Sequence, residues 1–300
     1  MTTTEKHAYL IIAHNEPDVL SVLVRMLDDP RNDIFLHIDS KSDISRFKQG
    51  CIKSHLYFVP RLNVLWGDFS MIRCELSLFS FARDKGPYAV YHLISGVDLP
   101  LKSQDYIHSY FDIHRDENMI SILDYDSTAK EVTKRMSYYW LFPHRGKNVI
   151  LHYLSCASVY VQKLLHINRN RNLKFYKGSE WCSLSDDFVC YILEHRDWIE
   201  SVFKMTNCGD EIYKQTLLKM AGSKFKQCYD AFAKPSDGRF IDWTGCKSSP
   251  RILRFNNYDA LVSTDALFAR KFSSADFSVI EAIERHVCQL SCKYFDKSKK

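Results

Sequence analysis

His7-Ala-Tyr-Leu-Ile-Ile-Ala13 is a nearly continuous apolar run, and the turn His14-Asn-Glu-Pro17 follows it directly. A run of this kind is typical of a strand that is buried on both faces, as in a parallel sheet. Pro17 is acceptable in the first turn of a helix, where its missing N–H is not needed. Apolar residues then recur at helical spacing: Leu20, Val22, Leu23, Met26 and Leu27. The sequence therefore predicts a buried strand followed by an amphipathic helix.

Strand and helix patterns continue to alternate through the first half of the chain. We expect strands at residues 33–38, 56–59, 64–65, 88–94 and 119–123, and helices at 69–82 and 105–112. This order predicts the α/β fold class, with a mainly parallel, Rossmann-like central sheet and helices on both faces. Ligands of such sheets bind at the carboxyl ends of the strands. Neither a GxGxxG after the first strand nor a P-loop motif is present, which argues against the familiar dinucleotide and P-loop sites.

The second half of the chain is less regular. Helices are expected at 130–140, 150–165, 186–193 and 209–220, with Ser185 as the N-cap of the third. The basic stretch 168–177 lacks apolar periodicity and is predicted to be an exposed loop, and the polar tail 293–300 is predicted to be frayed. Because no Gly/Ser-rich linker or internal repeat interrupts the sequence, we expect a single domain over residues 1–300.

The composition narrows the class of protein. Of the 300 residues, 46% are hydrophobic and 26% are charged, which is ordinary for a globular protein with a sizeable core. The net charge of +5 is compatible with anionic ligands or a membrane surface, but does not resemble the field of a nucleic-acid binder. The ten cysteines are scattered without a CxxC pair, so free buried thiols are expected rather than disulfides or a structural zinc site. No secretory signal stands at the start of the sequence, which predicts a cytoplasmic location.

Residues 240–272 combine an aromatic platform with cationic groups. The platform is Phe240-Ile-Asp-Trp243, and the cations are Arg251, Arg270 and Lys271, each among apolar or turn-forming residues. Cations in such surroundings usually meet an anion, because an unpaired buried charge is costly. A ligand diphosphate would be such an anion, while surface charges or ordinary ion pairs are the alternative for each cation alone.

Two acidic positions could carry chemistry. Glu211 follows Gly209-Asp210 at a predicted helix start, where a rigidly held carboxylate can act as a general base. An acidic residue in a first turn also complements the helix dipole, so this alternative stays open. Asp124-Tyr-Asp126 has the DxD form that holds a divalent metal in many nucleotide-sugar enzymes, and it also fits a turn after a strand.

Further candidates lie at the predicted strand ends. Asp39 closes the second strand, a place suited to a base or ribose hydroxyl, although a turn-stabilising Asp fits equally well. Ser95 and Gly96 let the chain turn sharply after a buried strand. Their position predicts the wall of a pocket.

Taken in order, several strings resemble one family, the core-2/I-branching β-1,6-N-acetylglucosaminyltransferases with the related protein xylosyltransferases. The resemblance extends from Ala8 to about Phe272. It rests on Ile11-Ile-Ala-His14, His37-Ile-Asp-Ser-Lys41, Val64-Leu-Trp-Gly-Asp-Phe-Ser70, His92-Leu-Ile-Ser-Gly-Val-Asp-Leu-Pro-Leu-Lys102, Lys177-Gly-Ser-Glu-Trp181, Gly209-Asp-Glu211, Phe240-Ile-Asp-Trp243 and Phe268-Ala-Arg-Lys-Phe272. Each string is short, but their order and spacing together are specific.

The resemblance implies a GT-A-type fold and an inverting, metal-independent transfer from a UDP-sugar, with no cofactor. Glu211 then matches the catalytic base, and Arg251 and Lys271 match the pair that holds the UDP diphosphate. Further donor contacts would come from Asp39, His14, Ser95 and Gly96, and acceptor contacts from Trp243, Asp124, Arg135 and Trp181. Arg270 would be structural.

The family also suggests how the chain is used. Residues 1–125 would form the nucleotide-binding half and residues 126–290 the acceptor and catalytic half. The sequence lacks the membrane anchor and stem of animal members, which suggests a bacterial enzyme of surface polysaccharide synthesis. Its partners would be a UDP-sugar, most commonly UDP-GlcNAc, and a glycan acceptor, either free or on a lipid carrier at the inner face of the membrane. The alternatives are a metal-dependent glycosyl- or nucleotidyltransferase using Asp124 and Asp126, and a noncatalytic protein that binds sugar nucleotides or glycans.

Overall fold

A five-stranded sheet organises the molecule in the computed structural model, which describes residues 6–141, 149–229, 236–246 and 249–297. The strand order is β3-β2-β1-β4-β7. The first four strands are parallel and β7 is antiparallel to β4. The strands are β1 (His7–Ala13), β2 (Asn32–Ile38), β3 (His55–Phe58), β4 (Val90–Ser95) and β7 (Cys182–Ser185). The predicted α/β class with a mainly parallel sheet is therefore confirmed.

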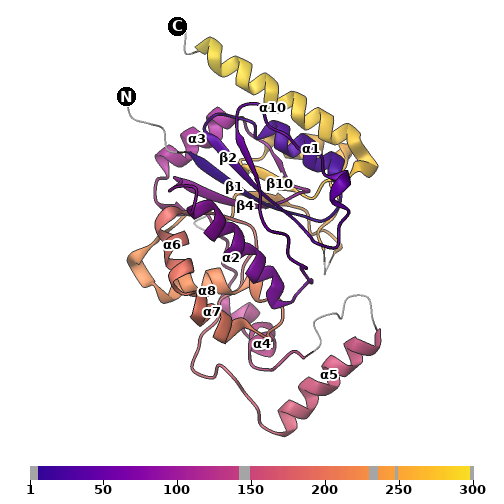
Figure 1. Ribbon diagram of the computed structural model, residues 1–300, viewed down its shortest axis with the longest axis vertical. Coiled ribbons are helices and arrows are strands. Elements are labelled where there is room, and N and C mark those ends of the chain that lie inside the picture. Colours follow the sequence, from indigo (N-terminus) through magenta and orange to yellow (C-terminus); the bar gives the residue numbers. More distant parts are fainter. Residues whose placement is uncertain (1–5, 142–148, 230–235, 247–248, 298–300) are drawn as a thin grey trace.

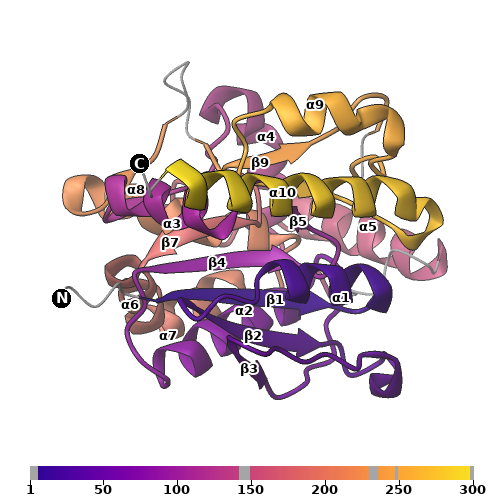
Figure 2. The ribbon, with the colours of Figure 1, turned by 90° about the horizontal axis from the view of Figure 1, so that it is seen from above.

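The sheet separates two hydrophobic cores, because successive side chains of a strand point to opposite faces. In β1, Leu10 and Ile12 belong to one core, and Tyr9 and Ile11 to the other. The first core is covered by α2 (Phe69–Arg83), α6 (Asp186–Glu194), α7 (Arg196–Phe203) and α8 (Tyr213–Met220). The second core is covered by α1 (Pro17–Met26), α3 (Gln104–Ile113) and α10 (Phe277–Lys297) (Figures 1 and 2). Burial on both faces explains why β1 reads as a continuous apolar run.

Smaller elements complete the fold. A second sheet has the order β5-β10-β9, and β6 pairs with β8. These strands are β5 (Leu99–Pro100), β6 (Glu117–Asn118), β8 (Lys226–Gln227), β9 (Arg239–Ile241) and β10 (Phe268–Arg270). The remaining α-helices are α4 (Tyr125–Met136), α5 (Val149–Leu164) and α9 (Tyr258–Ser263). The nine cysteines whose side chains are described are all free thiols, as predicted, but only Cys74, Cys182, Cys208 and Cys228 are buried.

Two short predicted strands are wrong. Residues 64–65 form no strand, because the Val64 amide donates to the Asp39 carboxylate and the Leu65 amide donates to the Ser70 hydroxyl. Residues 120–123 also lie outside the strands, and only Met119 forms an isolated bridge, with Ser183. In both places side chains or distant loops take the backbone bonds that a neighbouring strand would need.

Several helix boundaries also differ from the prediction. Helix α4 begins at Tyr125, earlier than expected, because the Asp124 carboxylate caps it through the Ser127 amide at 2.9 Å. The expected helix 209–220 is broken into a 3-10 turn, Gly209–Glu211, and α8. The break follows from a contact across the chain, since the Glu211 carbonyl accepts the Gly178 amide at 2.9 Å. Helix α10 continues to Lys297, so residues 293–297 are helical rather than frayed.

Candidate active site

Several of the predicted site residues lie at the carboxyl edge of the parallel sheet. Asp39 directly follows β2, and Ser95 ends β4. Strand β7 runs antiparallel to β4, with Cys182 opposite Leu93. The segment that precedes β7, residues 177–181, therefore reaches the same edge from the second half of the chain.

The two diphosphate candidates are held side by side by strand pairing. Strand β10 runs parallel to β9, so Lys271 and Asp242 leave the two strands in the same direction. The chain at 251–253 lies between them, since the Arg251 amide donates to the Asp242 carbonyl at 2.8 Å and the Leu253 amide donates to the Lys271 carbonyl at 2.9 Å. The Arg251 guanidinium is 54% exposed and 3.8 Å from the Asp242 carboxylate, so most of its donors face solvent. Trp243 is 50% exposed on the same segment, which leaves ring surface for a ligand.

Lys271 also lies against the ends of β1 and β4. Its ammonium donates to the Ser249 hydroxyl at 2.6 Å. The next amide, that of Phe272, donates to the Val97 carbonyl at 2.9 Å. Partial burial of the His14 ring lowers its pKa. The Asp39 carboxylate raises this pKa, whereas the positive charges of Lys41 and Lys271 lower it further. His14, Asp39 and Lys271 therefore border one polar region.

Asp39 is buried and its carboxylate is already engaged. It accepts the Lys41 amide and ammonium, both at 2.8 Å, and the Val64 amide at 3.3 Å. These bonds hold the pKa of Asp39 below its ordinary value, although burial opposes them. The bonds fix the loop after β2, which is the turn-stabilising role that the sequence left open.

The loop after β4 forms the floor of this region. A Cβ on Gly96 would lie 2.8 Å from the Ala13 Cβ, so only glycine allows this close approach to β1. The Ser95 hydroxyl and amide donate to the fully buried Asp98 carboxylate. Burial raises the pKa of Asp98, and the Arg270 guanidinium, 3.5 Å away, opposes the shift. Ser95 and Gly96 thus shape the wall through backbone geometry.

Trp181 does not offer the acceptor-facing ring that was predicted. It is only 7% exposed, and the Arg270 guanidinium lies over its ring at 4.4 Å from the centroid. Arg270 is thereby held between Trp181 and Asp98, which agrees with the structural role expected for it. Burial within the first core explains why the ring is covered.

Glu211 lies in a four-membered charge network. Its Oε2 accepts the Arg135 guanidinium at 2.6 Å, and the Lys177 ammonium is 3.7 Å away. Glu131 contacts both cations, with Lys177 at 3.1 Å. The Glu211 side chain is 34% exposed, and among the described residues its side-chain hydrogen bond is made by Oε2. One carboxylate oxygen is therefore anchored, and Oε1 takes no part in that bond.

A buried charge cluster supports the turn that carries Glu211. The fully buried Lys214 ammonium contacts the Glu75 carboxylate and donates to the Asp210 carbonyl at 3.2 Å. Glu75 also accepts the Tyr213 hydroxyl at 2.6 Å. Burial lowers the pKa of Lys214, but Glu75 more than offsets this, so the ammonium stays charged. The pair clamps α8 to α2 directly beneath residues 209–211.

The sequence did not single out this cluster, although it carried a signal. Glu75 stands on the buried face of α2, between the core residues Ile72 and Phe79. Lys214 follows a buried Tyr in a similarly buried turn of α8. A Glu and a Lys in otherwise apolar surroundings predict each other as partners, because a buried charge is almost always paired.

Segment 177–181 joins the Glu211 side of the edge to the Lys271 side. The Gly178 amide bonds the Glu211 carbonyl, while Trp181 supports Arg270, the neighbour of Lys271. Between them, burial and the nearby Asp210 and Glu75 raise the pKa of Glu180, and Lys214 and Arg270 oppose the rise. Glu180 is thus close enough to interact electrostatically with groups beside Glu211, such as Asp210, and with Arg270 beside Lys271.

Gly178 should tolerate no side chain. A Cβ at this position would lie 1.9 Å from the Ser121 carbonyl oxygen, a backbone atom that cannot move away cheaply. We expect Gly178→Ala to lower the free energy of unfolding by about 2 kcal/mol, in urea titrations followed by circular dichroism. Gly50→Ala is the control, because a Cβ there meets nothing within 4 Å. Equal stabilities of the two variants would contradict this packing.

Asp210 should make stability depend on pH. Burial, with the fields of Glu211 and Glu75, raises its pKa from 3.8 to about 7. The native state then binds more protons than the unfolded state between these values, so the free energy of unfolding falls as pH rises from about 4 to 7. Asp210→Asn removes this dependence, and its stability relative to the parent should rise by at least about 1 kcal/mol between pH 5 and pH 8. Urea titrations at both pH values measure the difference; a pH-independent difference, like that of the exposed control Asp112→Asn, would contradict it.

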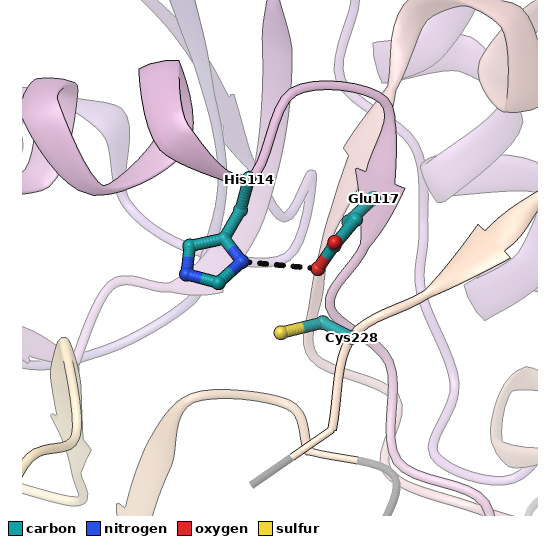
Figure 3. Close-up of side chains that lie close together, drawn as sticks. All are labelled: His114, Glu117 and Cys228. Atoms are coloured by element: carbon teal, nitrogen blue, oxygen red, sulfur yellow. Dashed lines mark hydrogen bonds and ion pairs between the residues drawn. The ribbon is translucent and has the colours of Figure 1, made fainter.

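Asp124 was a candidate for acceptor or metal binding, and one further group of side chains could hold a metal ion. Asp124 is exposed, and its carboxylate caps α4 by accepting the Ser127 amide. Among the described residues, the set of donor atoms close enough for an ion is His114, Glu117 and Cys228 (Figure 3). These donors already have partners: His114 Nδ1 bonds Glu117 at 3.1 Å, and the Cys228 sulfur bonds the Tyr110 hydroxyl at 3.4 Å.

Trp66 is a candidate that the sequence analysis did not assign. Its side chain is 67% exposed. The adjoining Gly67 carbonyl accepts the Cys208 amide at 2.9 Å, which places Trp66 beside the turn 209–211. Exposure of an aromatic ring close to the turn that carries Glu211 could be recognised only in the folded chain.

One comparison with known proteins identifies a family. The sequence model described as "Branch: Core-2/I-Branching enzyme" matches residues 7–262. A search of the curated proteins gives no significant match.

Two solved structures resemble this chain at low identity. The apo form of mouse xyloside xylosyltransferase 1 has 10% identity and a TM-score of 0.39, and the match covers 88% of this chain and 96% of that protein. The apo form of the glycosyltransferase GlyE from Streptococcus pneumoniae has 11% identity and a TM-score of 0.40, with coverage of 98% and 64%. Similarities as distant as these carry no argument about this chain.

Proposed function

This chain belongs to the Core-2/I-branching enzyme family of glycosyltransferases, and from that premise we propose that it transfers a sugar from a UDP-sugar to a hydroxyl of a glycan acceptor, with inversion and without a metal. The observation that carries the proposal is the placement of segment 177–181. It contacts Glu211 at one end and supports Arg270, beside Lys271, at the other. A general base and a diphosphate-binding pair would thus flank one substrate position.

Glu211 would act as the general base. In an inverting transfer the acceptor hydroxyl attacks the anomeric carbon from the face opposite the diphosphate, and its proton must leave as the bond forms. Arg135 anchors Glu211 Oε2 at 2.6 Å, which leaves Oε1 to accept that proton. Lys177 and Arg135 also place positive charge beside the carboxylate and hold it in position.

Arg251 and Lys271 would stabilise the leaving group. Negative charge grows on the departing diphosphate, and cations placed there stabilise the transition state more than the ground state. Arg251 offers a planar fork to two phosphate oxygens, whereas Lys271 acts as a point charge. In a metal-independent enzyme these two side chains would do the work of a bound cation.

The exposed aromatic rings suit sugar binding. Trp243, at 50% exposure, follows β9 beside the cationic pair, and Trp66 precedes Gly67, which contacts Cys208 before the turn 209–211. Aromatic faces pack well against the apolar faces of sugars, so we assign Trp243 to the acceptor and Trp66 to the wall of the site. UDP-GlcNAc is the donor we propose first, and synthesis of a surface polysaccharide is the proposed role.

A panel of nucleotide sugars tests the reaction. Donor hydrolysis and transfer are measured for UDP-GlcNAc, UDP-xylose and other UDP-hexoses, each with and without EDTA. We expect one UDP-sugar to be hydrolysed fastest and its rate to be unchanged by EDTA. A rate that EDTA abolishes and Mn²⁺ restores would overturn the metal-independent mechanism and favour a metal at Asp124 and Asp126. UDP binding without hydrolysis or transfer of any donor would favour the noncatalytic alternative.

A further inference from the structure

Helix α5 stands away from the sheet and its covering helices (Figure 1). Its buried positions are Ser155, Val159 and Gln162, so the side facing the protein is mostly polar. The Gln162 side chain donates to the Tyr139 carbonyl at 2.9 Å and to the Ser158 hydroxyl at 3.1 Å, which fixes this orientation. The helix is therefore held to the protein by polar contacts.

The apolar residues of α5 and its extension face outward. Their exposed fractions are Ile150 70%, Tyr153 69%, Leu154 46%, Tyr160 63%, Val161 50%, Leu164 61% and Leu165 66%. The spacing of three and four residues puts them on one stripe along the helix. An ordinary surface helix shows the reverse arrangement, with its apolar stripe on the core. A contiguous apolar stripe of this kind marks a binding surface.

The charge around α5 indicates what binds there. Residues 132–179 contain nine Lys and Arg and no Asp or Glu. Within α5 itself the only Lys or Arg is Lys163, and it is exposed, as is Lys174 farther along. Arg169 is different, because its guanidinium donates to backbone carbonyls at the end of α7. Arg135 and Lys177 are paired with Glu131 and Glu211, so the cations that remain for a ligand include Lys163 on α5 and Lys174 beyond it.

We propose that α5 is an interfacial helix that docks this protein on an anionic lipid surface. An apolar face with basic residues along its border is the arrangement of helices that lie in the plane of a membrane interface. Tyr153 and Tyr160 add rings of the kind that favour this interface. Among the described helices, none is long and apolar enough to span a bilayer, so the contact is peripheral. A second copy of the chain fits less well, because a two-fold contact through α5 would bring two basic segments together.

This inference goes beyond the proposed function and does not depend on the donor or the reaction. Flotation of the purified protein with vesicles tests it. We expect binding to vesicles made of equal parts phosphatidylglycerol and phosphatidylcholine, and little binding to phosphatidylcholine alone. The double variant Leu164→Asp/Leu165→Asp should lower the partition coefficient by at least about tenfold. Ile52→Asp is the matched control, because Ile52 is 96% exposed far from α5 in sequence.

The charge contribution is tested separately. Lys163→Glu/Lys174→Glu should lower binding to the anionic vesicles by about tenfold, with no change for the exposed control Lys53→Glu. Thermal melting checks that each variant remains folded. Equal binding to both vesicle types, or parent-like binding of the α5 variants, would overturn the proposal. So would a dimer in sedimentation velocity that the Leu164→Asp/Leu165→Asp variant dissolves, since it would assign the stripe to a second copy.

Discussion

Glu211→Gln is expected to lower the turnover number by about a thousandfold, because general-base catalysis typically contributes a factor of 10² to 10⁴. Glutamine keeps the shape of the side chain and can still meet Arg135, but it cannot accept the acceptor proton. Steady-state transfer assays measure the loss. Binding of UDP, followed by calorimetry, should be nearly unchanged, since Glu211 contacts Arg135 and Lys177 rather than the cationic pair at 251 and 271.

Glu131→Gln is the matched control for that variant. Glu131 contacts the same two cations, Arg135 and Lys177, but is 47% exposed. Its loss would perturb the network without removing a base, so we expect at most about a tenfold decrease. Equal losses in the two variants would show that the network, and not proton transfer, limits the reaction. Parent-like turnover of Glu211→Gln would contradict the assignment of Glu211 as the general base.

Lys271→Ala is expected to lower the turnover number by about 10² to 10³, the cost of removing one preorganised group at a developing negative charge. Its ammonium lies at the edge of the sheet, 2.6 Å from the Ser249 hydroxyl, and its charge also lowers the pKa of His14. Arg251→Ala should cost a similar factor. Arg251→Lys should recover only part of it, because lysine keeps the charge but loses the planar fork. Both Ala variants should also weaken UDP binding, and calorimetry with UDP measures this.

Arg254→Ala controls for charge near the same segment. Arg254 is exposed three residues beyond Arg251, so its removal changes the net charge equally. We expect parent-like turnover and UDP affinity for it. Losses as large as those of Lys271→Ala would mean that the general field of the surface matters rather than a specific contact. Unchanged UDP affinity in Lys271→Ala and Arg251→Ala would place the diphosphate elsewhere.

The sequence could predict that Arg251 and Lys271 bind an anion, but it could not predict that they lie side by side. The sequence placed Arg251 and Lys271 in turn-forming or apolar surroundings, which favours an anion. Their side-by-side position comes from the parallel pairing of β9 with β10 and from the backbone bonds of residues 251–253. Trp181 shows the opposite case, since its aromatic character was evident but its burial under Arg270 was not.

The anchor of Glu211 was likewise invisible in the sequence. Helical spacing predicted a continuous helix from 209 to 220, yet the amide of Gly178 takes the Glu211 carbonyl and breaks it. Arg135, Lys177 and Glu211 come from three separate regions of the chain. Local pattern cannot encode such contacts, because they depend on how the antiparallel strand β7 brings segment 177–181 to the sheet edge.

The sequence by itself determined the local elements of this protein. A strand buried on both faces is apolar at nearly every position, which identified β1. Pro17 and the apolar spacing after it identified α1, and the Ser185 cap identified the start of α6. Tertiary structure alone decided which distant charges meet and which apolar faces stay exposed. Strand direction and register set the cluster around Glu211, and the polar anchoring of α5 through Gln162 leaves its apolar stripe in solvent. Periodicity shows that a helix has two faces, but only packing determines which of them faces the core.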